Sequence, residues 1–176
     1  MIGVDVNPQV ISTLQNGGLH IHEPGLRTLV QAALGSGNLS VSEIPEQADA
    51  FIIAVPTPFY NERYGSYQDH VYKLADMRAV TSASEAIVPL LHRGNLVMLE
   101  STSPPRTTVD LVAPILERSG MKAGIDFLLA YSPERVLPGQ ILRELIENAR
   151  VIGGINQSSA EAGLSLIHIS EPTRPY

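Results

Sequence analysis

The sequence predicts an α/β fold in which helices cover both faces of a doubly wound, mostly parallel sheet. Three observations support this prediction. Short, apolar, β-branched runs alternate with longer segments of helical period, which is the pattern of βα units. Two of these runs are almost entirely apolar, as is typical of parallel strands that are buried on both faces. The chain has 176 residues, 44% of them hydrophobic, which suits about one domain with a sizeable core.

The strands are expected at residues 2–6, 39–42, 50–55, 96–99, 127–131 and 150–152. The first helix is bounded by Asn7, a good N-cap, by Pro8 at its first position, and by the glycines at 17 and 18. Further helices are expected over residues 24–34, 76–91 and 106–119, and from about residue 158 onward. Asp76 can cap the helix expected over 76–91, and Pro114 can kink the helix expected over 106–119. Residues 56–75 are polar, rich in Pro and Tyr, and aperiodic, so a long functional loop is expected there.

The end of the chain breaks this pattern. From Ser165 onward the helical period is expected to stop, and the stretch Leu166–Arg174 resembles a translated sequencing adaptor or vector read-through. Residues 164–176 are therefore predicted to be a non-native tail that takes no part in the fold.

Composition excludes several classes of function. The net charge is −6 and no Lys/Arg cluster occurs, so neither nucleic acid nor an anionic membrane is expected as a partner. No apolar run approaches the roughly 18 residues of a membrane helix and no signal peptide is recognisable, so a cytoplasmic location is expected. The chain has no cysteine, which excludes a disulfide, a thiolate metal site and a cysteine nucleophile within these residues. His20 and His22 lack a third ligand nearby, so no metal site is predicted.

Asp5 ends the first expected strand. In a doubly wound dinucleotide-binding sheet, the acidic residue that ends the second strand binds the adenosine ribose and favours NAD over NADP. A strand-end Asp that supports the turn at Asn7 is an equally good interpretation. No G-x-G-x-x-G occurs in the chain, so the glycine loop and the strand before it are expected to have preceded Met1.

Polar loops follow three of the later strands. Thr57 lies in Val-Pro-Thr-Pro after the third strand, where it can touch a cofactor. The two prolines there are also typical of a strand end that has no binding role. The hydroxyl-rich stretch 100–104 can bind an anion, a ribose or a catalytic water, or it can merely begin a helix. In the stretch 131–139, Glu134 is a candidate acid or base, and Arg135 can meet a carboxylate or phosphate. A surface pair of Glu134 with Arg135 is the alternative.

Four segments together resemble one family over residues 1 to about 160. They are Ile-Gly-Val-Asp-Val-Asn at 2–7, Ala-Val-Pro-Thr-Pro-Phe at 54–59, Leu-Glu-Ser-Thr-Ser-Pro at 99–104 and Ser-Pro-Glu-Arg-Val-Leu-Pro-Gly at 132–139. In this order and spacing the chain resembles the UDP-glucose/GDP-mannose dehydrogenases, which are NAD-dependent nucleotide-sugar 6-dehydrogenases. The last segment is similar to the UDP-N-acetyl-D-mannosamine dehydrogenase branch of that family.

The resemblance implies a Rossmann-like fold that lacks its first strand and glycine loop, with residues 1–163 as a partial NAD-binding domain. It implies oxidation of the C6 alcohol of a UDP-sugar to the carboxylate through a cysteine thioester. The implied substrate is UDP-N-acetyl-D-mannosamine, oxidised to the mannosaminuronate for surface polysaccharide precursors. UDP-N-acetylglucosamine and UDP-glucose are alternatives, and so is a non-catalytic nucleotide-binding domain. The family's catalytic Lys and Cys lie in a later region, so this chain alone is expected to be inactive. The parent protein is expected to be a homodimer or a higher homo-oligomer.

The resemblance also implies roles for individual residues. Asp5 would bind the adenosine ribose of NAD, and Thr57 and Thr102 would contact NAD. Thr102 would also hold the catalytic water, and Glu134 would assist hydrolysis. Arg135 and Val136 would lie against the nucleotide sugar. The chain departs from the family pattern at position 106, where an Arg stands in place of the usual glycine at a helix N-terminus.

Overall fold

The computed structural model describes the backbone of residues 1–170 and the side chains of residues 1–167. The chain forms two compact units. One, called here the first unit, combines residues 1–47 with residues 135–149; the other, the sheet unit, combines residues 48–134 with residues 150 onward. In the part of the chain that is described, no helix is both long and apolar enough to cross a membrane.

The first unit contains a parallel strand pair and three helices. Its elements are β1 (Ile2–Val4), α1 (Pro8–Gln15), α2 (Leu26–Gly35), β2 (Ser40–Ser42) and α5 (Ile141–Glu147). Strand β1 pairs with β2, with Ile2 opposite Ser40. The predicted start of the first helix is confirmed, because the Asn7 side chain accepts the Gln9 N–H at 3.0 Å and Pro8 is the first helical residue.

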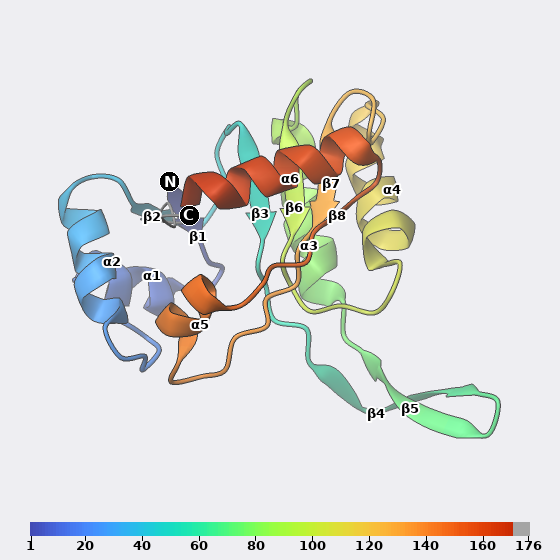
Figure 1. Ribbon diagram of the computed structural model, residues 1–176, viewed down its shortest axis with the longest axis horizontal. Helices are drawn as coiled ribbons and strands as arrows, with labels where there is room; N and C mark the ends of the chain where they lie inside the picture. The colour runs from blue at the N-terminus through green and yellow to red at the C-terminus, as the bar shows by residue number, and fades with distance from the viewer. Residues whose placement is uncertain (171–176) are drawn as a thin grey trace. The chain divides into compact units, whose positions relative to one another are not determined.

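The sheet unit is built on four strands in the order β3-β6-β7-β8 (Figure 1). Strands β3 (Ala50–Ile53), β6 (Leu96–Leu99) and β7 (Leu128–Tyr131) run parallel, as predicted, and β8 (Gly153–Gly154) is antiparallel to β7. The prediction of a strand at 150–152 is wrong in its position, because the strand lies at residues 153–154. The chain pairs only at the two glycines, where it passes so close to α6 that a Cβ on Gly154 would lie 2.2 Å from the Ala160 nitrogen.

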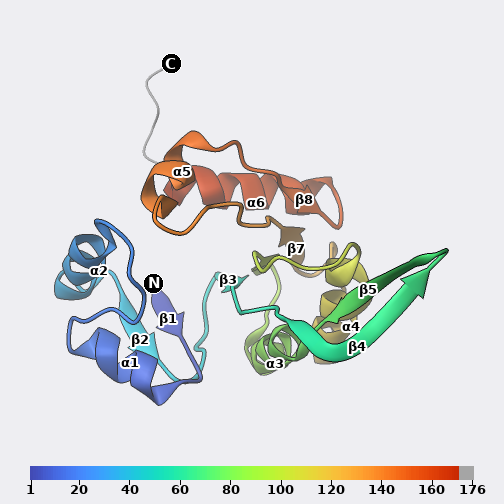
Figure 2. The same ribbon diagram turned by 90° about the horizontal axis from the view of Figure 1, so that it is seen from below.

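Helices cover both faces of this sheet (Figures 1 and 2). One face carries α3 (Arg78–Ile87), the 3-10 turn η1 (Val88–Leu90), the π-helical turn η2 (Thr108–Val112), α4 (Ala113–Leu116) and the 3-10 turn η3 (Glu117–Ser119). The other face carries α6 (Gln157–Ser170). Alternate residues of β6 therefore enter two different cores: Val97 and Leu99 the first, Leu96 and Met98 the second. The predicted doubly wound α/β fold is confirmed, with the helix expected over 106–119 broken into short turns around Pro114.

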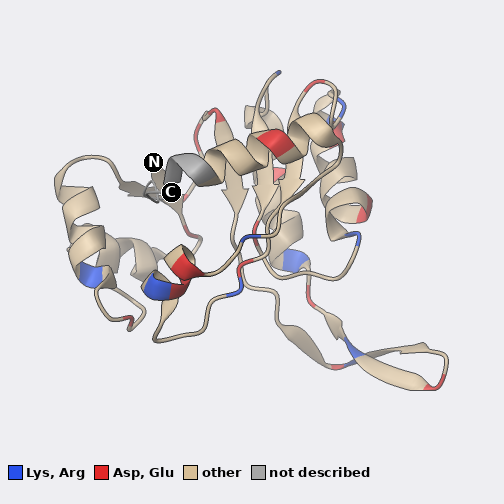
Figure 3. Ribbon diagram, viewed as in Figure 1, with Lys and Arg blue, Asp and Glu red and all other residues tan. Residues whose placement is uncertain are grey.

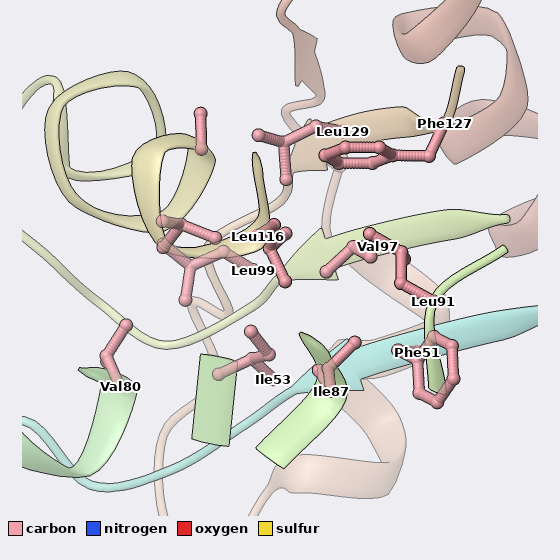
Figure 4. Packing of buried hydrophobic residues seen from close by; sticks show 12 residues of the cluster. Phe51, Ile53, Val80, Ile87, Leu91, Val97, Leu99, Leu116, Phe127 and Leu129 are labelled. Carbon is pink, nitrogen blue, oxygen red and sulfur yellow. The ribbon is translucent and has the colours of Figure 1, made fainter. Parts of the chain in front are cut away.

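The larger core lies between the strands and the helices α3 and α4. Figure 4 shows Phe51 and Ile53 of β3 and Val97 and Leu99 of β6 meeting residues of these helices. None of the three parallel strands contains a charged residue, as Figure 3 shows. Strands buried on both faces need this composition because an unpaired charge inside the sheet would be strongly unfavourable.

Residues 56–75 are not the predicted loop. Most of them form an antiparallel hairpin of β4 (Phe59–Tyr67) and β5 (His70–Ala75), which projects from the rest of the sheet unit (Figure 1). Gly65 of β4 lies opposite Tyr72 of β5, and a Cβ on Gly65 would come within 2.7 Å of the Tyr72 ring. Gln68 makes the turn with a φ of 52°. Cross-strand contacts such as that of Tyr72 with Gly65 stabilise the hairpin.

Helix α6 continues beyond the predicted break at Ser165, which is therefore wrong for the backbone as far as Ser170. Ile167 is 4% exposed and joins the second core with Leu96, Met98 and Ala130. Gly163 allows the close contact, since a Cβ there would lie 3.1 Å from the Cβ of Ala130. Residues 171–176 of the predicted tail lie outside the described residues, and the non-native origin of the tail stays a prediction.

Candidate functional site

Three loops of the sheet unit follow the carboxyl ends of β3, β6 and β7, and parallel pairing brings those ends to one edge of the sheet. The first two loops are joined by hydrogen bonds. The Thr57 hydroxyl donates to the Thr102 carbonyl at 2.5 Å, and the Ser101 hydroxyl donates to the Val55 carbonyl at 2.7 Å. Two of the predicted cofactor residues, Thr57 and Thr102, are thus brought together from positions 45 residues apart. The Thr102 side chain is exposed and its hydroxyl makes no hydrogen bond among the described residues.

The third loop is joined to the second through its backbone. The Ser132 N–H donates to the Leu99 carbonyl at 3.0 Å, and the Glu134 N–H donates to the Glu100 carbonyl at 3.3 Å. The side chain of Ser132 is fully buried, and its hydroxyl has no hydrogen-bond partner within the described part of the chain. A buried hydroxyl in this state is unusual and points to a partner from outside the chain, such as a ligand or water.

Glu134 forms an ion pair with Arg150, whose guanidinium lies 3.1 Å from the carboxylate. Both side chains are partly buried, at 37% and 21% exposed, so the pair is better shielded than one on an open surface. A carboxylate held by a cation in a defined direction can act on a water or a leaving group. Sequence analysis did not single out Arg150, because the partners are 16 residues apart and no local pattern links them.

Glu100 lies beside the same pair. Burial raises the pKa of the Glu100 carboxyl, the Arg150 cation opposes that rise, and the Glu134 carboxylate adds to it. Two carboxyl groups with different surroundings therefore flank one guanidinium, an arrangement that is common where protons are exchanged.

Asp5 lies in the first unit, directly after β1. Its Oδ1 accepts the Asn7 N–H at 2.8 Å, so Asp5 supports the turn at Asn7, as one of the two interpretations of the sequence predicts. Its other oxygen makes no hydrogen bond among the described residues and can accept from a ligand hydroxyl. One Asp5 oxygen thus stabilises the turn, and the other can accept a hydrogen bond, as a ribose-binding carboxylate must.

Arg135 and Val136, the predicted substrate residues, also lie in the first unit. The Arg135 guanidinium donates to the Ala149 carbonyl, and the Asn148 side chain donates to the Arg135 carbonyl at 3.3 Å. Glu23, which no sequence motif marks, is a buried carboxylate that accepts hydrogen bonds from this part of the chain at Gly139 and Ile141. Its partners lie 116 and 118 residues later, so no local signal could have identified it.

Arg106 adopts a φ of 70° just before the π-helical turn. This left-handed conformation costs a non-glycine residue about 1 kcal/mol, which explains why glycine suits the position. The Arg106 side chain turns to Asp110, with an ion-pair distance of 2.7 Å. Within the described residues, no group of three His, Cys, Asp or Glu side chains could hold a metal ion.

A family model described as the NAD-binding domain of the UDP-glucose/GDP-mannose dehydrogenase family matches residues 1–169. A UDP-N-acetyl-D-mannosamine dehydrogenase of Methanococcus maripaludis is 48% identical over 161 residues, 92% of this chain and 34% of that protein. An NDP-N-acetyl-D-galactosaminuronic acid dehydrogenase of Ralstonia solanacearum is 41% identical over 176 residues, 96% of this chain and 39% of that protein. The chain thus spans between a third and two fifths of the length of these relatives.

Solved structures of the same family are also similar to this chain. The native UDP-N-acetyl-mannosamine dehydrogenase of Staphylococcus aureus superposes with a TM-score of 0.86 at 44% identity, covering 95% of this chain and 39% of that one. A UDP-glucose dehydrogenase of Pyrobaculum islandicum gives a TM-score of 0.76 at 36% identity, covering 95% and 38%. The chain therefore belongs to the UDP-glucose/GDP-mannose dehydrogenase family, whose NAD-binding domain its residues 1–169 match.

Proposed function

We propose that this chain is the cofactor-binding part of a longer enzyme that oxidises the C6 alcohol of a UDP-sugar to a carboxylate. In that reaction one alcohol, two NAD⁺ and one water give one carboxylate, two NADH and three protons. The observation that carries the proposal is one edge of the sheet, where Thr57, Thr102 and Glu134 lie in three loops that follow parallel strands and are joined to one another by hydrogen bonds. This is the edge at which open α/β sheets bind ligands.

The donor set of the chain fits NAD. Asp5 offers a carboxylate oxygen to the adenosine ribose hydroxyls, and its charge disfavours the extra phosphate of NADP. Thr57 and Thr102 offer hydroxyls at the sheet edge, and the buried Ser132 hydroxyl lacks a partner among the described residues. When bound, NAD accepts the hydrides that leave the sugar C6. The chain's own residues bind and orient the cofactor and the sugar.

Glu134 and Thr102 are proposed to act in the hydrolytic half of the reaction. The exposed Thr102 hydroxyl would hold a water, and the Glu134 carboxylate, oriented by Arg150, would take a proton from it. The thioester that this water attacks would be on a cysteine outside these residues, because the chain contains none. Arg135 and Val136 would lie against the nucleotide sugar.

UDP-N-acetyl-D-mannosamine is the proposed substrate, because several of the similar proteins are named as its dehydrogenases. UDP-N-acetylglucosamine and UDP-glucose are the alternatives. A non-catalytic nucleotide-binding domain is the second candidate function. The second Asp5 oxygen and the Ser132 hydroxyl, which have no hydrogen-bond partner among the described residues, suit it as well. The cytoplasmic location and the homo-oligomeric state of the parent stay predictions.

The first test uses the 176-residue chain alone. Mixed with NAD and UDP-N-acetyl-D-mannosamine, it is expected to form no NADH, because neither a phosphate-binding glycine loop nor a nucleophile is present in it. Calorimetric titration with NAD is expected to show no micromolar binding. NADH formation would contradict the expected inactivity of the chain alone, and micromolar affinity would contradict the expectation that tight NAD binding needs the glycine loop.

The positive test restores the remaining parts of the enzyme. Residues 1–163 replace the matching segment of the S. aureus UDP-N-acetyl-mannosamine dehydrogenase, and two NADH per sugar are expected from UDP-N-acetyl-D-mannosamine. In this chimera Glu134→Gln should lower kcat by about 10²- to 10⁴-fold, the usual contribution of a general acid or base. Glu46→Gln, at an exposed carboxylate, is the matched control. A folded chimera that oxidises only UDP-glucose would overturn the substrate, and full activity of Glu134→Gln would overturn that residue's role.

A further inference from the structure

Glu23 is a buried carboxylate in the loop between α1 and α2, with 7% of its surface exposed. Both of its oxygens accept backbone N–H groups from a distant part of the first unit. Oε2 accepts from Gly139 at 2.8 Å and Oε1 accepts from Ile141 at 2.8 Å. Hydrogen bonds to an ionised acceptor are about twice as strong as neutral ones, so this contact is a strong local constraint.

The stretch Arg135–Ile141, called here the substrate segment, has almost no regular structure of its own. From Leu137 onward, alternate residues donate their backbone N–H groups to carboxylates: Leu137 to Glu144 at 2.6 Å, and then Gly139 and Ile141 to Glu23. Gly139 has a φ of 87°, in the region that favours glycine. Side chains rather than a strand or helix ladder therefore determine the shape of this segment.

The two carboxylates differ in where they come from. Glu144 belongs to α5, seven residues after its partner, so it ties the segment only to the adjoining helix. Glu23 comes from the N-terminal part of the chain, more than a hundred residues earlier. Its hydrogen bonds attach the segment to the N-terminal part of the first unit. A Cβ on nearby Gly25 would lie 3.1 Å from Leu142 of α5.

We infer that Glu23 is a positioning residue, which holds the substrate segment in the conformation that presents Arg135 and Val136. The inference about the segment's shape stands on the two hydrogen bonds, and its consequence for the sugar rests on the proposed function. Losing Glu23 should loosen the segment without touching the residues proposed for NAD.

The first experiment measures amide hydrogen exchange by NMR in this chain. Glu23→Gln keeps the size of the side chain but leaves only one acceptor oxygen and no charge. The Gly139 and Ile141 amides should exchange at least about tenfold faster in this variant, as an open amide does relative to a hydrogen-bonded one. The Leu137 amide, bound to Glu144, is the internal reference and should change less than about twofold. Glu46→Gln is the matched control and should change neither.

Glu23→Asp keeps the charge on a shorter side chain and should give intermediate exchange at both amides, a partial rescue that a general loss of stability would not produce. It also keeps the test decisive if Glu23→Gln fails to fold. Unprotected Gly139 and Ile141 amides in the wild-type chain, or unchanged exchange in both variants, would overturn the inference.

The second experiment uses the chimera with the S. aureus enzyme. Glu23→Gln should raise the KM for the UDP-sugar about tenfold while kcat and the KM for NAD change less than about threefold, the pattern of lost substrate binding. Glu23→Asp should recover part of the loss. Equal losses in kcat and in both KM values would overturn the positioning role. If the wild-type chimera turns over no UDP-sugar, the proposed function fails, while the exchange experiment still decides whether Glu23 holds the segment.

Discussion

Asp76 shows how one side chain can both begin a helix and hold a charge. Its Oδ1 accepts the Arg78 N–H at 3.1 Å, and its carboxylate receives the Arg78 guanidinium at 2.5–3.0 Å. The hydrogen bonds from Arg78 hold the pKa of the Asp76 carboxyl well below its usual range. The sequence predicts Asp76 as the N-cap of this helix, but Met77 occupies that position and makes no side-chain cap; Asp76 lies one residue earlier and accepts the first helical N–H instead.

A lowered pKa makes this contribution dependent on pH. The folded state favours the ionised carboxyl, so its stabilisation is complete above the unfolded-state pKa, about 3.9, and is lost as the pH falls through the lower folded-state pKa. Asp76→Asn should therefore lower the melting temperature at neutral pH, and the difference should shrink below about pH 4. Melting followed by circular dichroism at both pH values tests this, with Asp69→Asn in the exposed hairpin turn as the control. A difference that is independent of pH would contradict it.

Residue roles were predictable where the signal lay in neighbouring residues. Asn7 and Pro8 were identified correctly because a helix start is written in consecutive positions. Glu23 and Arg150 were missed because their partners are far along the chain. A single sequence does not distinguish a buried charged residue that hydrogen-bonds the backbone from a solvent-exposed one.

At the scale of elements, the apolar runs gave β3, β6 and β7 correctly, whereas polar stretches were misjudged. The pattern predicts a loop where the hairpin of β4 and β5 lies, because its strands are mostly exposed and lack the alternation that a buried face imposes. The two-residue strand β8 depends on the approach of α6 rather than on its own sequence. Periodicity finds elements that bury a face and overlooks those that do not.

Helix α6 supplies a test of where the folded region extends. Because Ile167 fills the second core beside Leu96 and Met98, Ile167→Ala should lower the free energy of unfolding by about 2 kcal/mol. Leu164→Ala, at a side chain that is 45% exposed on the same helix, should change it by less than about 0.5 kcal/mol. Urea denaturation of the three proteins gives these values. Equal stabilities for Ile167→Ala and the wild type would mean that the residues after 163 take no part in the core.

At the scale of the whole molecule, β3 is an edge strand of the four-stranded sheet. Among the described residues, β3 pairs with β6 on one side and with no strand on the other. It is uncharged, and Ile52 is 47% exposed. An open, apolar edge of this kind invites pairing with another chain.

The isolated chain is therefore expected to self-associate, and Ile52→Lys should raise its monomeric fraction, since a lysine on an edge strand opposes pairing. Size-exclusion chromatography with light scattering measures the fraction. Ile125→Lys, at a residue that is 84% exposed outside any strand, is the control and should leave association unchanged. A monodisperse wild-type monomer would contradict the prediction.

The sequence by itself determined the fold class, the order of most elements, the family and the loops that carry Asp5, Thr57, Thr102 and Glu134. These features are expressed in short stretches of residues, as periodicity, caps and motifs. The tertiary structure alone decided the hairpin, the reach of α6 and the partners of Glu23, Glu134 and Ser132. Those depend on contacts between residues far apart in the chain, whose free energy exists only once the backbone brings them within hydrogen-bonding or van der Waals distance.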